Sequence, residues 1–241
     1  MLDLKEIGDL ISEVPQEEQL PPHLEGLTLP EMLPIFPKTV AVYHFGAADH
    51  YELKTFVKDY IASNPATENS WGKNLSTWHN SDKENFLDVE EPIVQKFKSF
   101  LSTSFETLVK VYQWKMTTDH FIPACWINKT TKDGFQQRHN HSNSWVSGTY
   151  YLDFKENSSP IRFWDNIGEY NSPYLWSDLD EFNPFNSHFV DLNPKEGDLF
   201  LWKSNIMHET LPELSDERIS ISMNFIPTEI KTGPYSIRVS N

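Results

Sequence analysis

Two histidines, His139 and His141, stand two residues apart within a stretch whose composition is typical of a β-strand, residues 135–151. Successive side chains of a strand point to opposite faces, so these two imidazoles share a face and lie about 6 to 7 Å apart along the strand. Imidazoles at this spacing can bind one metal ion. Two solvated loop histidines would give the same short pattern, so the metal interpretation depends on residues elsewhere in the chain.

A second group of polar residues follows about 70 positions later. A third histidine, His208, is followed ten residues later by Arg218 and then by Ser220. Three linked motifs accompany them: Ser-Gly-Thr-Tyr-Tyr-Leu at 147–152, Gly-Asp-Leu at 197–199 and Arg-Ile-Ser-Ile-Ser-Met-Asn-Phe at 218–225. Taken together, these spacings resemble the iron(II)/2-oxoglutarate-dependent oxygenase superfamily, and more closely a branch found mostly in phages and marine bacteria. The resemblance covers roughly residues 33–226, with its specific motifs confined to 126–226.

The resemblance implies a fold, a reaction and a set of site residues. The fold is a double-stranded β-helix, or jelly roll. The enzyme would use iron(II), 2-oxoglutarate and O2 and would hydroxylate a substrate with release of succinate and CO2. Arg218 and Ser220 would bind the distal carboxylate of 2-oxoglutarate, for which a guanidinium offers a planar, bidentate match. Tyr150, in preference to Tyr151, and Asn224 are expected to reach the co-substrate or the substrate.

The metal site departs from the commonest pattern of the superfamily, in which the second position is a carboxylate. That position is His141 here, and the nearest acids, Asp153 and Asp165, are outside the His-x-His register. We expect His139, His141 and His208 to be the three ligands. Two histidines completed by water or substrate, or His141 and His208 with His139 as a neighbour, are the alternatives. Three neutral histidines do not balance the +2 charge of the metal ion, so exogenous anions must balance it. The two carboxylates of bound 2-oxoglutarate would do so.

Other functions remain compatible with the same residues. A three-histidine metalloenzyme of the cupin type would use no 2-oxoglutarate, and Arg218 would then have no carboxylate to bind. A non-catalytic jelly-roll binding module is a further alternative, with Arg218 in a surface salt bridge to Glu217 or Asp216. The substrate class stays open between small molecules and peptides, and the oligomeric state cannot be derived from the sequence.

The composition narrows the partners and the compartment. The chain has 241 residues, a formal net charge of −15 and a single cysteine, Cys125. Such an acidic surface repels phosphate backbones and anionic membranes, which makes duplex nucleic acid a disfavoured partner. One cysteine excludes an intramolecular disulfide, and the N-terminal residues contain no long apolar run. We therefore expect a cytoplasmic protein.

The hydrophobic pattern predicts one domain at 34–241, preceded by an arm at 1–33. Helices are expected at about 49–63 and 89–110, where apolar residues recur at helical spacing, and short strands form a β core at about 111–226. The polar residues 64–87 are expected to form a loop. Residues 166–184 are a candidate substrate lid, or else a plain surface excursion.

Overall fold

The structure, a computed structural model, describes residues 38–66, 72–78, 85–165 and 188–240. The chain divides into two compact units, Met1–Lys38 and Thr39–Asn241. The first unit, which contains the expected arm, lies almost entirely outside the described residues, and so does the expected lid at 166–184. All the helices and strands below belong to the second unit.

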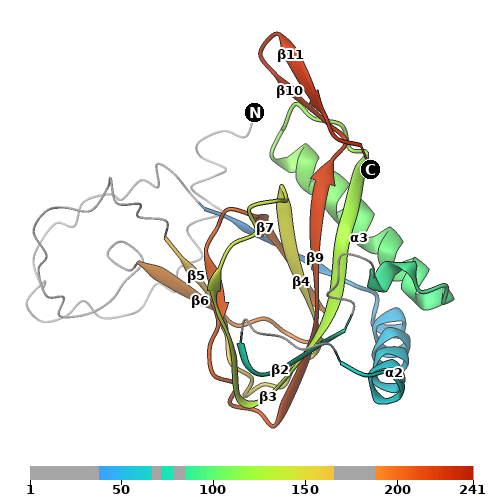
Figure 1. The fold of residues 1–241 in the computed structure, drawn as a ribbon, viewed down its shortest axis with the longest axis vertical. Helices are drawn as coiled ribbons and strands as arrows, with labels where there is room; N and C mark the ends of the chain where they lie inside the picture. Colours follow the sequence, from blue (N-terminus) through green and yellow to red (C-terminus); the bar gives the residue numbers. More distant parts are fainter. Residues whose placement is uncertain (1–37, 67–71, 79–84, 166–187, 241) are drawn as a thin grey trace, which may run out of the picture. The chain divides into compact units, whose positions relative to one another are not determined.

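The described part of the chain is mostly β-structure with two α-helices (Figure 1). The helices are α2 (Ala47–Ser63) and α3 (Pro92–Val111), and a 3-10 turn, η2, spans Phe86–Asp88. The strands are β1 (Val40–His44), β2 (Gly72–Trp78), β3 (His120–His139), β4 (Val146–Asp153), β5 (Ile161–Trp164), β6 (Phe189–Leu192), β7 (Asp198–Lys203), β8 (His208–Thr210), β9 (Glu217–Pro227), β10 (Glu229–Thr232) and β11 (Tyr235–Arg238).

Nine strands form one antiparallel sheet that curls round on itself, with the order β1-β7-β4-β9-β3-β8-β5-β6 and β2 paired to β3 (Figure 1). The long strand β3 joins two parts of this sheet, because its first half pairs with β9 and its last residues pair with β8. The expected jelly roll with bracing helices is therefore confirmed. Strands β10 and β11 form a separate hairpin.

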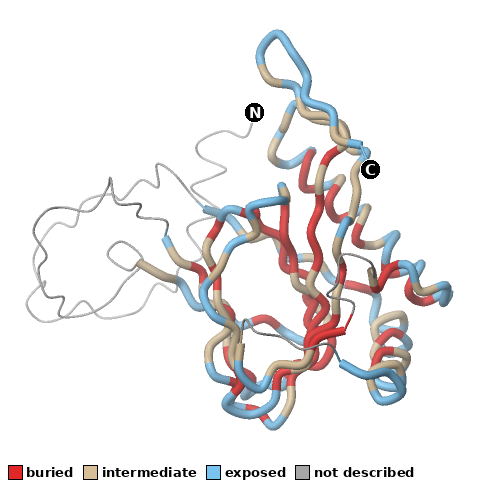
Figure 2. The backbone as a smooth tube through the Cα atoms, in the orientation of Figure 1, coloured by how far each residue is buried: buried red, intermediate tan, exposed pale blue. Residues whose placement is uncertain are grey.

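The two faces of the central strands differ in polarity and in what they contact. One face packs against α2 and α3 and is apolar, as the buried residues of β9 show: Ile219, Ile221, Met223 and Phe225. The opposite face of the same strand points into the barrel and carries Arg218, Ser220, Ser222 and Asn224. The period of two along a strand thus separates a helix-covered core from a polar interior. Figure 2 shows the buried residues concentrated along these central strands and on the inner side of α3.

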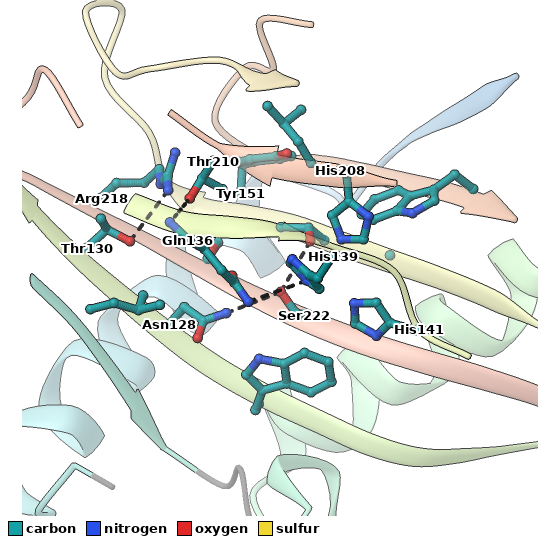
Figure 3. A pocket seen from close by; sticks show the side chains of 17 residues that line it. Asn128, Thr130, Gln136, His139, His141, Tyr151, His208, Thr210, Arg218 and Ser222 are labelled. Carbon is teal, nitrogen blue, oxygen red and sulfur yellow. Dashed lines mark hydrogen bonds between the residues drawn. The ribbon is translucent and has the colours of Figure 1, made fainter. Parts of the chain in front are cut away.

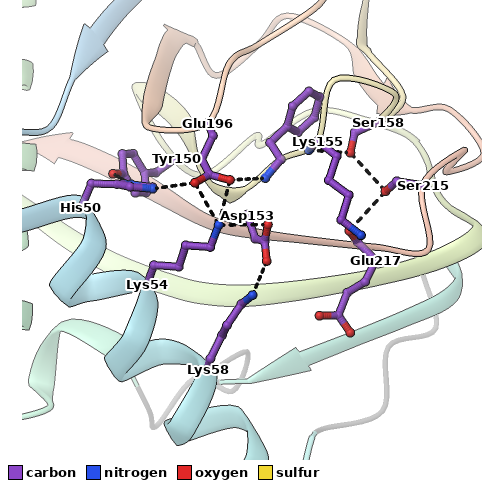
Figure 4. Close-up of polar contacts among 11 residues, drawn as sticks. His50, Lys54, Lys58, Tyr150, Asp153, Lys155, Ser158, Glu196, Ser215 and Glu217 are labelled. Atoms are coloured by element: carbon purple, nitrogen blue, oxygen red, sulfur yellow. Dashed lines mark hydrogen bonds and ion pairs between the residues drawn. The ribbon is translucent and has the colours of Figure 1, made fainter. Parts of the chain in front are cut away.

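A polar network joins α2 to the end of β4 and to the loop before β7 (Figure 4). Lys54 Nζ lies 3.1 Å from Asp153 Oδ1 and 2.8 Å from Glu196 Oε2. Lys58 Nζ lies 2.5 Å from the other oxygen of Asp153. Ion pairs in this partly exposed setting contribute little to the free energy of unfolding individually, but several that share partners fix the angle at which the helix meets the sheet.

Two local features differ from the expectation. Residues 64–87 were expected to form a loop, but they contain β2 (Gly72–Trp78). This strand pairs antiparallel with β3 between Ile127 and Gln136. Strand β3 is longer than the short strands that were expected, and it continues through Asp133 and Gly134, with Asp133 at a positive φ of 62°. This bend lets one strand serve both parts of the sheet. None of the helices in the described ranges is both long and apolar enough to cross a membrane.

Gly148, in the centre of β4, is a position where any side chain should destabilise the fold. A Cβ added there would lie 2.4 Å from Leu201 Cδ2 and 2.9 Å from both Met223 Sδ and the Phe200 carbonyl oxygen. We expect Gly148→Ala to lower the free energy of unfolding by about 1 to 3 kcal/mol, the usual cost of overpacking a core. Urea denaturation measures it.

Gly46→Ala is the matched control, because an added Cβ there meets only Asp49, at 3.4 Å. We expect that control to change the free energy of unfolding by less than about 1 kcal/mol, as helix-start substitutions of this kind do. Equal losses in the two variants would contradict the packing described for β4.

Candidate functional site

Three histidine side chains meet inside the barrel at one end of a pocket (Figure 3). His139 ends β3 and is the register partner of His208 on β8, while His141 follows two residues after the end of β3. One ligand nitrogen from each ring lies within 4.8 Å of the others. The ring centroids are separated by 4.3 Å for His139 and His208 and by 5.3 Å for His141 and His208. Imidazoles this close can share one metal ion.

Backbone carbonyls orient two of the rings. His139 Nδ1 lies 2.7 Å from the Gln137 carbonyl oxygen, and His208 Nδ1 lies 3.0 Å from that of Ile206. A carbonyl oxygen only accepts, so each Nδ1 carries the proton and donates it. The Nε2 atoms then carry the lone pairs that could bind a metal, and the partner carbonyls fix the tautomer.

Burial keeps these imidazoles neutral. It lowers the pKa of His208 to about 3 and that of His141 to about 4, and His139 adds repulsion in both cases. Burial also lowers the pKa of His139. Metal ligands must be deprotonated, so all three nitrogens are available at neutral pH without a proton having to leave.

The lowered pKa values predict an acid-sensitive metal-free protein. The unfolded chain binds a proton at each histidine below about pH 6.5, whereas folded His208 does not until about pH 3. The free energy of unfolding should therefore fall as pH decreases through this window, by about 2 kcal/mol between pH 7 and pH 5 for His208 alone. Urea titrations with a chelator present measure this slope.

His208→Asn should flatten the slope, because the variant has no buried imidazole to titrate at this position. A metal-free wild type whose stability is constant from pH 7 to pH 5 would show that His208 is not held neutral.

Arg218 lies at the other end of the same pocket, 3% exposed (Figure 3). Its Nη1 lies 3.2 Å from Glu213 Oε2 and donates to the Ser159 carbonyl oxygen at 3.3 Å, and its Nη2 donates weakly to Thr130 Oγ1 at 3.5 Å. The surface ion pair with Glu217 or Asp216 is therefore not formed. Burial lowers the pKa of Arg218, while the negative charge of Glu213 opposes this, and an arginine stays charged in any case.

Two buried donors at this end of the pocket lack acceptors in the described part of the chain. They are Nε of Arg218 and the hydroxyl of Tyr151. Burial raises the pKa of Tyr151, so its hydroxyl keeps its proton. Unpaired buried donors are rare and usually indicate a ligand. A carboxylate could accept from both, so the residues fit a co-substrate with an acid group at this end.

Tyr151, and not Tyr150 as expected, is the tyrosine of β4 that faces the pocket. Tyr150 points to the helices, and its hydroxyl lies 2.6 Å from His50 Nδ1 (Figure 4). Tyr151 points into the barrel and lines the pocket. The sequence did contain a signal for this, because Tyr150 shares its face with apolar Val146 and Leu152, whereas Tyr151 shares its face with Ser147 and Thr149.

The remaining expected residues lie on the interior face of β9. Ser220 lines the pocket between Arg218 and the histidines. Asn224 lies two positions further along the same face, beyond Ser222, accepts a hydrogen bond from Ser147 at 2.9 Å, and contacts the His141 side chain. Asn224 is thus placed to orient a histidine rather than to line the pocket.

Several pocket residues were not anticipated. They are the polar residues that share the interior face with the histidines and the arginine: Asn128, Thr130, Gln136, Thr149, Thr210 and Ser222. Asn128 and Thr130 alternate along β3 with buried Cys125 and Ile127, so the period of two could have identified them. Gln136 Nε2 lies 3.4 Å from His139 Nε2, beside the nitrogen that would bind a metal.

Residues 124–224 match the family described as "Putative 2OG-Fe(II) oxygenase". The matched segment begins in β3, ends in β9 and contains all three histidines and Arg218. The part of the β core that carries the candidate site is therefore similar to the 2OG-Fe(II) oxygenases. No curated protein sequence matches the chain.

Solved structures share the oxygenase fold at low sequence identity. A Pseudomonas putida prolyl-4-hydroxylase is 14% identical with a TM-score of 0.56, over 81% of this chain and 94% of the other. A prolyl hydroxylase from Trichoplax adhaerens, in complex with a hypoxia inducible factor peptide fragment, is 14% identical with a TM-score of 0.54, over 78% and 83%. HygX from Streptomyces hygroscopicus, with nickel, 2-oxoglutarate and hygromycin B bound, is 13% identical with a TM-score of 0.51, over 79% and 84%.

Proposed function

We propose that this oxygenase hydroxylates a small-molecule or peptide substrate, with iron(II) held by His139, His141 and His208 and with 2-oxoglutarate as co-substrate. The observation that supports it most is the pocket itself. One end holds three neutral imidazoles within 4.8 Å of one another, and the other end holds a buried arginine. A metal-chelating dicarboxylate needs both ends at once.

The chain's own residues have separable roles in this proposal. The three imidazoles fix the metal and bring no charge to it. Arg218 Nε and the Tyr151 hydroxyl donate to the distal carboxylate, and Ser220 adds a hydroxyl between them and the metal. When bound, iron(II), 2-oxoglutarate and O2 would supply the oxidation: one oxygen atom of O2 would enter succinate as the co-substrate loses CO2, and the other would be inserted into a substrate C–H bond. The protein positions both and excludes water.

The substrate classes are those of the similar structures, whose ligands include a peptide fragment and hygromycin B. The net charge of −15 disfavours duplex nucleic acid. The free, buried Cys125 is compatible with a reducing cytoplasm, which we propose as the compartment.

A thermal-shift titration with Mn²⁺ and 2-oxoglutarate tests the assignment. Ligands that bind only the folded state raise the unfolding temperature in proportion to their saturation. We expect the two together to stabilise the protein by more than the sum of their separate effects. Stabilisation by the metal alone, with no further effect of 2-oxoglutarate, would favour the cupin-type enzyme, and no shift with either would favour a binding module.

A further inference from the structure

Glu213 is a buried carboxylate that the proposed reaction does not use. It lies in the loop between β8 and β9, is 0% exposed, and sits behind Arg218 with Oε2 3.2 Å from Nη1. Isolated charges are almost never buried, because the loss of hydration is costly unless a partner compensates for it. The pair therefore has to be explained as a unit.

The position of this carboxylate is fixed from several directions. Its Oε1 accepts from the Ser159 backbone N–H at 3.2 Å, the Ser215 backbone N–H at 3.0 Å and the Ser215 hydroxyl at 2.7 Å. Its backbone N–H donates to the Gly134 carbonyl oxygen at 2.8 Å, and its own carbonyl oxygen accepts from Asp133 N–H at 2.9 Å. Glu213 is thus anchored to the bend of β3. Its Oε2 accepts no hydrogen bond from the described residues and lies at ion-pair distance from the arginine.

The charges of the site can be counted from these residues. Among the described residues that line the pocket, Arg218 alone carries a permanent charge. The three imidazoles are neutral, and Glu213 cancels the charge of Arg218. An empty pocket is therefore electrically neutral. Metal alone would bring +2 and 2-oxoglutarate alone −2 into a buried space, whereas the two together bring no net charge.

We propose that Glu213 is a positioning residue that neutralises Arg218 and so makes metal and 2-oxoglutarate bind as a unit. In the commonest pattern of the superfamily, a carboxylate ligand brings one negative charge to the metal, and His141 brings none. In this proposal Glu213 supplies that negative charge instead, at the arginine end of the pocket. This inference rests on the proposed function. Its distinctive consequence is that a dicarboxylate without metal binds poorly, because Arg218 is already paired.

Glu213→Gln tests this consequence with glutarate, which has both carboxylates of 2-oxoglutarate but no keto group. The amide keeps the shape and the Oε1 acceptor while the charge is lost. We expect glutarate to bind the metal-free variant about tenfold or more tightly than it binds the metal-free wild type. The reason is that the variant has lost a negative charge within several ångströms of the arginine that binds the ligand. The increase in 2-oxoglutarate affinity caused by Mn²⁺ should shrink correspondingly. Both are measured by calorimetric titration.

Glu217→Gln is the matched control. It removes one negative charge next to Arg218 in the sequence, but its side chain is 40% exposed and pairs with Lys129 instead. Its metal-free glutarate affinity should stay within about twofold of wild type, because solvent screens the charge. A purely structural role of Glu213 would lower the unfolding temperature and leave the glutarate affinity unchanged or reduced, which would overturn the proposal.

Glu213→Asp serves if the glutamine variant does not fold. It keeps the charge but withdraws it from the guanidinium by one carbon, so metal-free glutarate affinity should rise in the same direction by a smaller factor. An unchanged or lower affinity would again overturn the inference. Failure of the proposed function is a different result, because wild type would then show no joint stabilisation by Mn²⁺ and 2-oxoglutarate.

Discussion

His139→Ala is expected to abolish the stabilisation by Mn²⁺ and to reduce Fe(II)-dependent formation of succinate from 2-oxoglutarate by at least about 100-fold. Loss of groups that merely orient a metal ligand typically costs 10- to 100-fold, and loss of a ligand should cost no less. His139 is the best of the three histidines to remove. It lies 4.3 Å from His208 by ring centroids, yet it is less buried than His208, so the change should disturb the core least. Thermal shift and a coupled succinate assay measure the two effects.

Arg138→Ala is the control for this variant. It is the preceding residue on β3 and points to the outer face, where its guanidinium lies 4.5 Å from the centre of the Trp164 ring. We expect normal metal binding and turnover. If His139→Ala still bound Mn²⁺ with wild-type affinity, the metal would be held by His141 and His208 with His139 as a neighbour, which is one of the alternatives that the sequence left open.

How far the sequence could predict this site depends on which kind of information a residue pattern contains. A period of two places His139 with His141, and Arg218 with Ser220, on common strand faces without any knowledge of the fold. Together with the family resemblance, that information led to the prediction of the residues that the structure places at both ends of the pocket. The same period also distinguishes the two faces of β4, because Tyr150 alternates with apolar residues and Tyr151 with polar ones, although both faces are buried. The expectation that Tyr150 faces the pocket did not use this signal and was wrong.

Other features depended on contacts that no local pattern encodes. Strand β2 consists largely of polar residues, and we therefore expected this segment to be part of a loop. It is a strand because it pairs with β3, which the local sequence does not show. Glu213 is only five residues before Arg218 in the sequence, but an acidic residue in a polar loop is ordinarily solvated. Its burial results from the donors of Ser159 and Ser215, which the fold brings to it. The sequence analysis named only Glu217 and Asp216 as alternative partners of Arg218, because only proximity along the chain was visible.

Arg218→Lys is expected to raise the KM for 2-oxoglutarate by about 10- to 100-fold while kcat at saturating co-substrate changes little. A guanidinium can contact Glu213 and Ser159 with one edge and present Nε to the pocket, whereas an ammonium is a single point of charge that cannot do both. Loss of one charge-assisted hydrogen bond of about 1.5 to 3 kcal/mol corresponds to this range of affinity. Because Lys keeps the charge opposite Glu213, the variant should remain folded.

Arg162→Lys provides the comparison, since it makes the same chemical change on an arginine outside the pocket. Arg162 forms a two-point pair with Asp191, with distances of 2.6 and 2.7 Å, and should leave the KM for 2-oxoglutarate unaltered. Steady-state kinetics on both variants, with 2-oxoglutarate varied at fixed Fe(II), decides the role of Arg218. A raised KM for the oxidised substrate with no change for 2-oxoglutarate would mean that Arg218 binds the substrate. The unpaired Nε would then be satisfied by a group of the substrate, and the distal carboxylate of 2-oxoglutarate would have to bind elsewhere in the pocket.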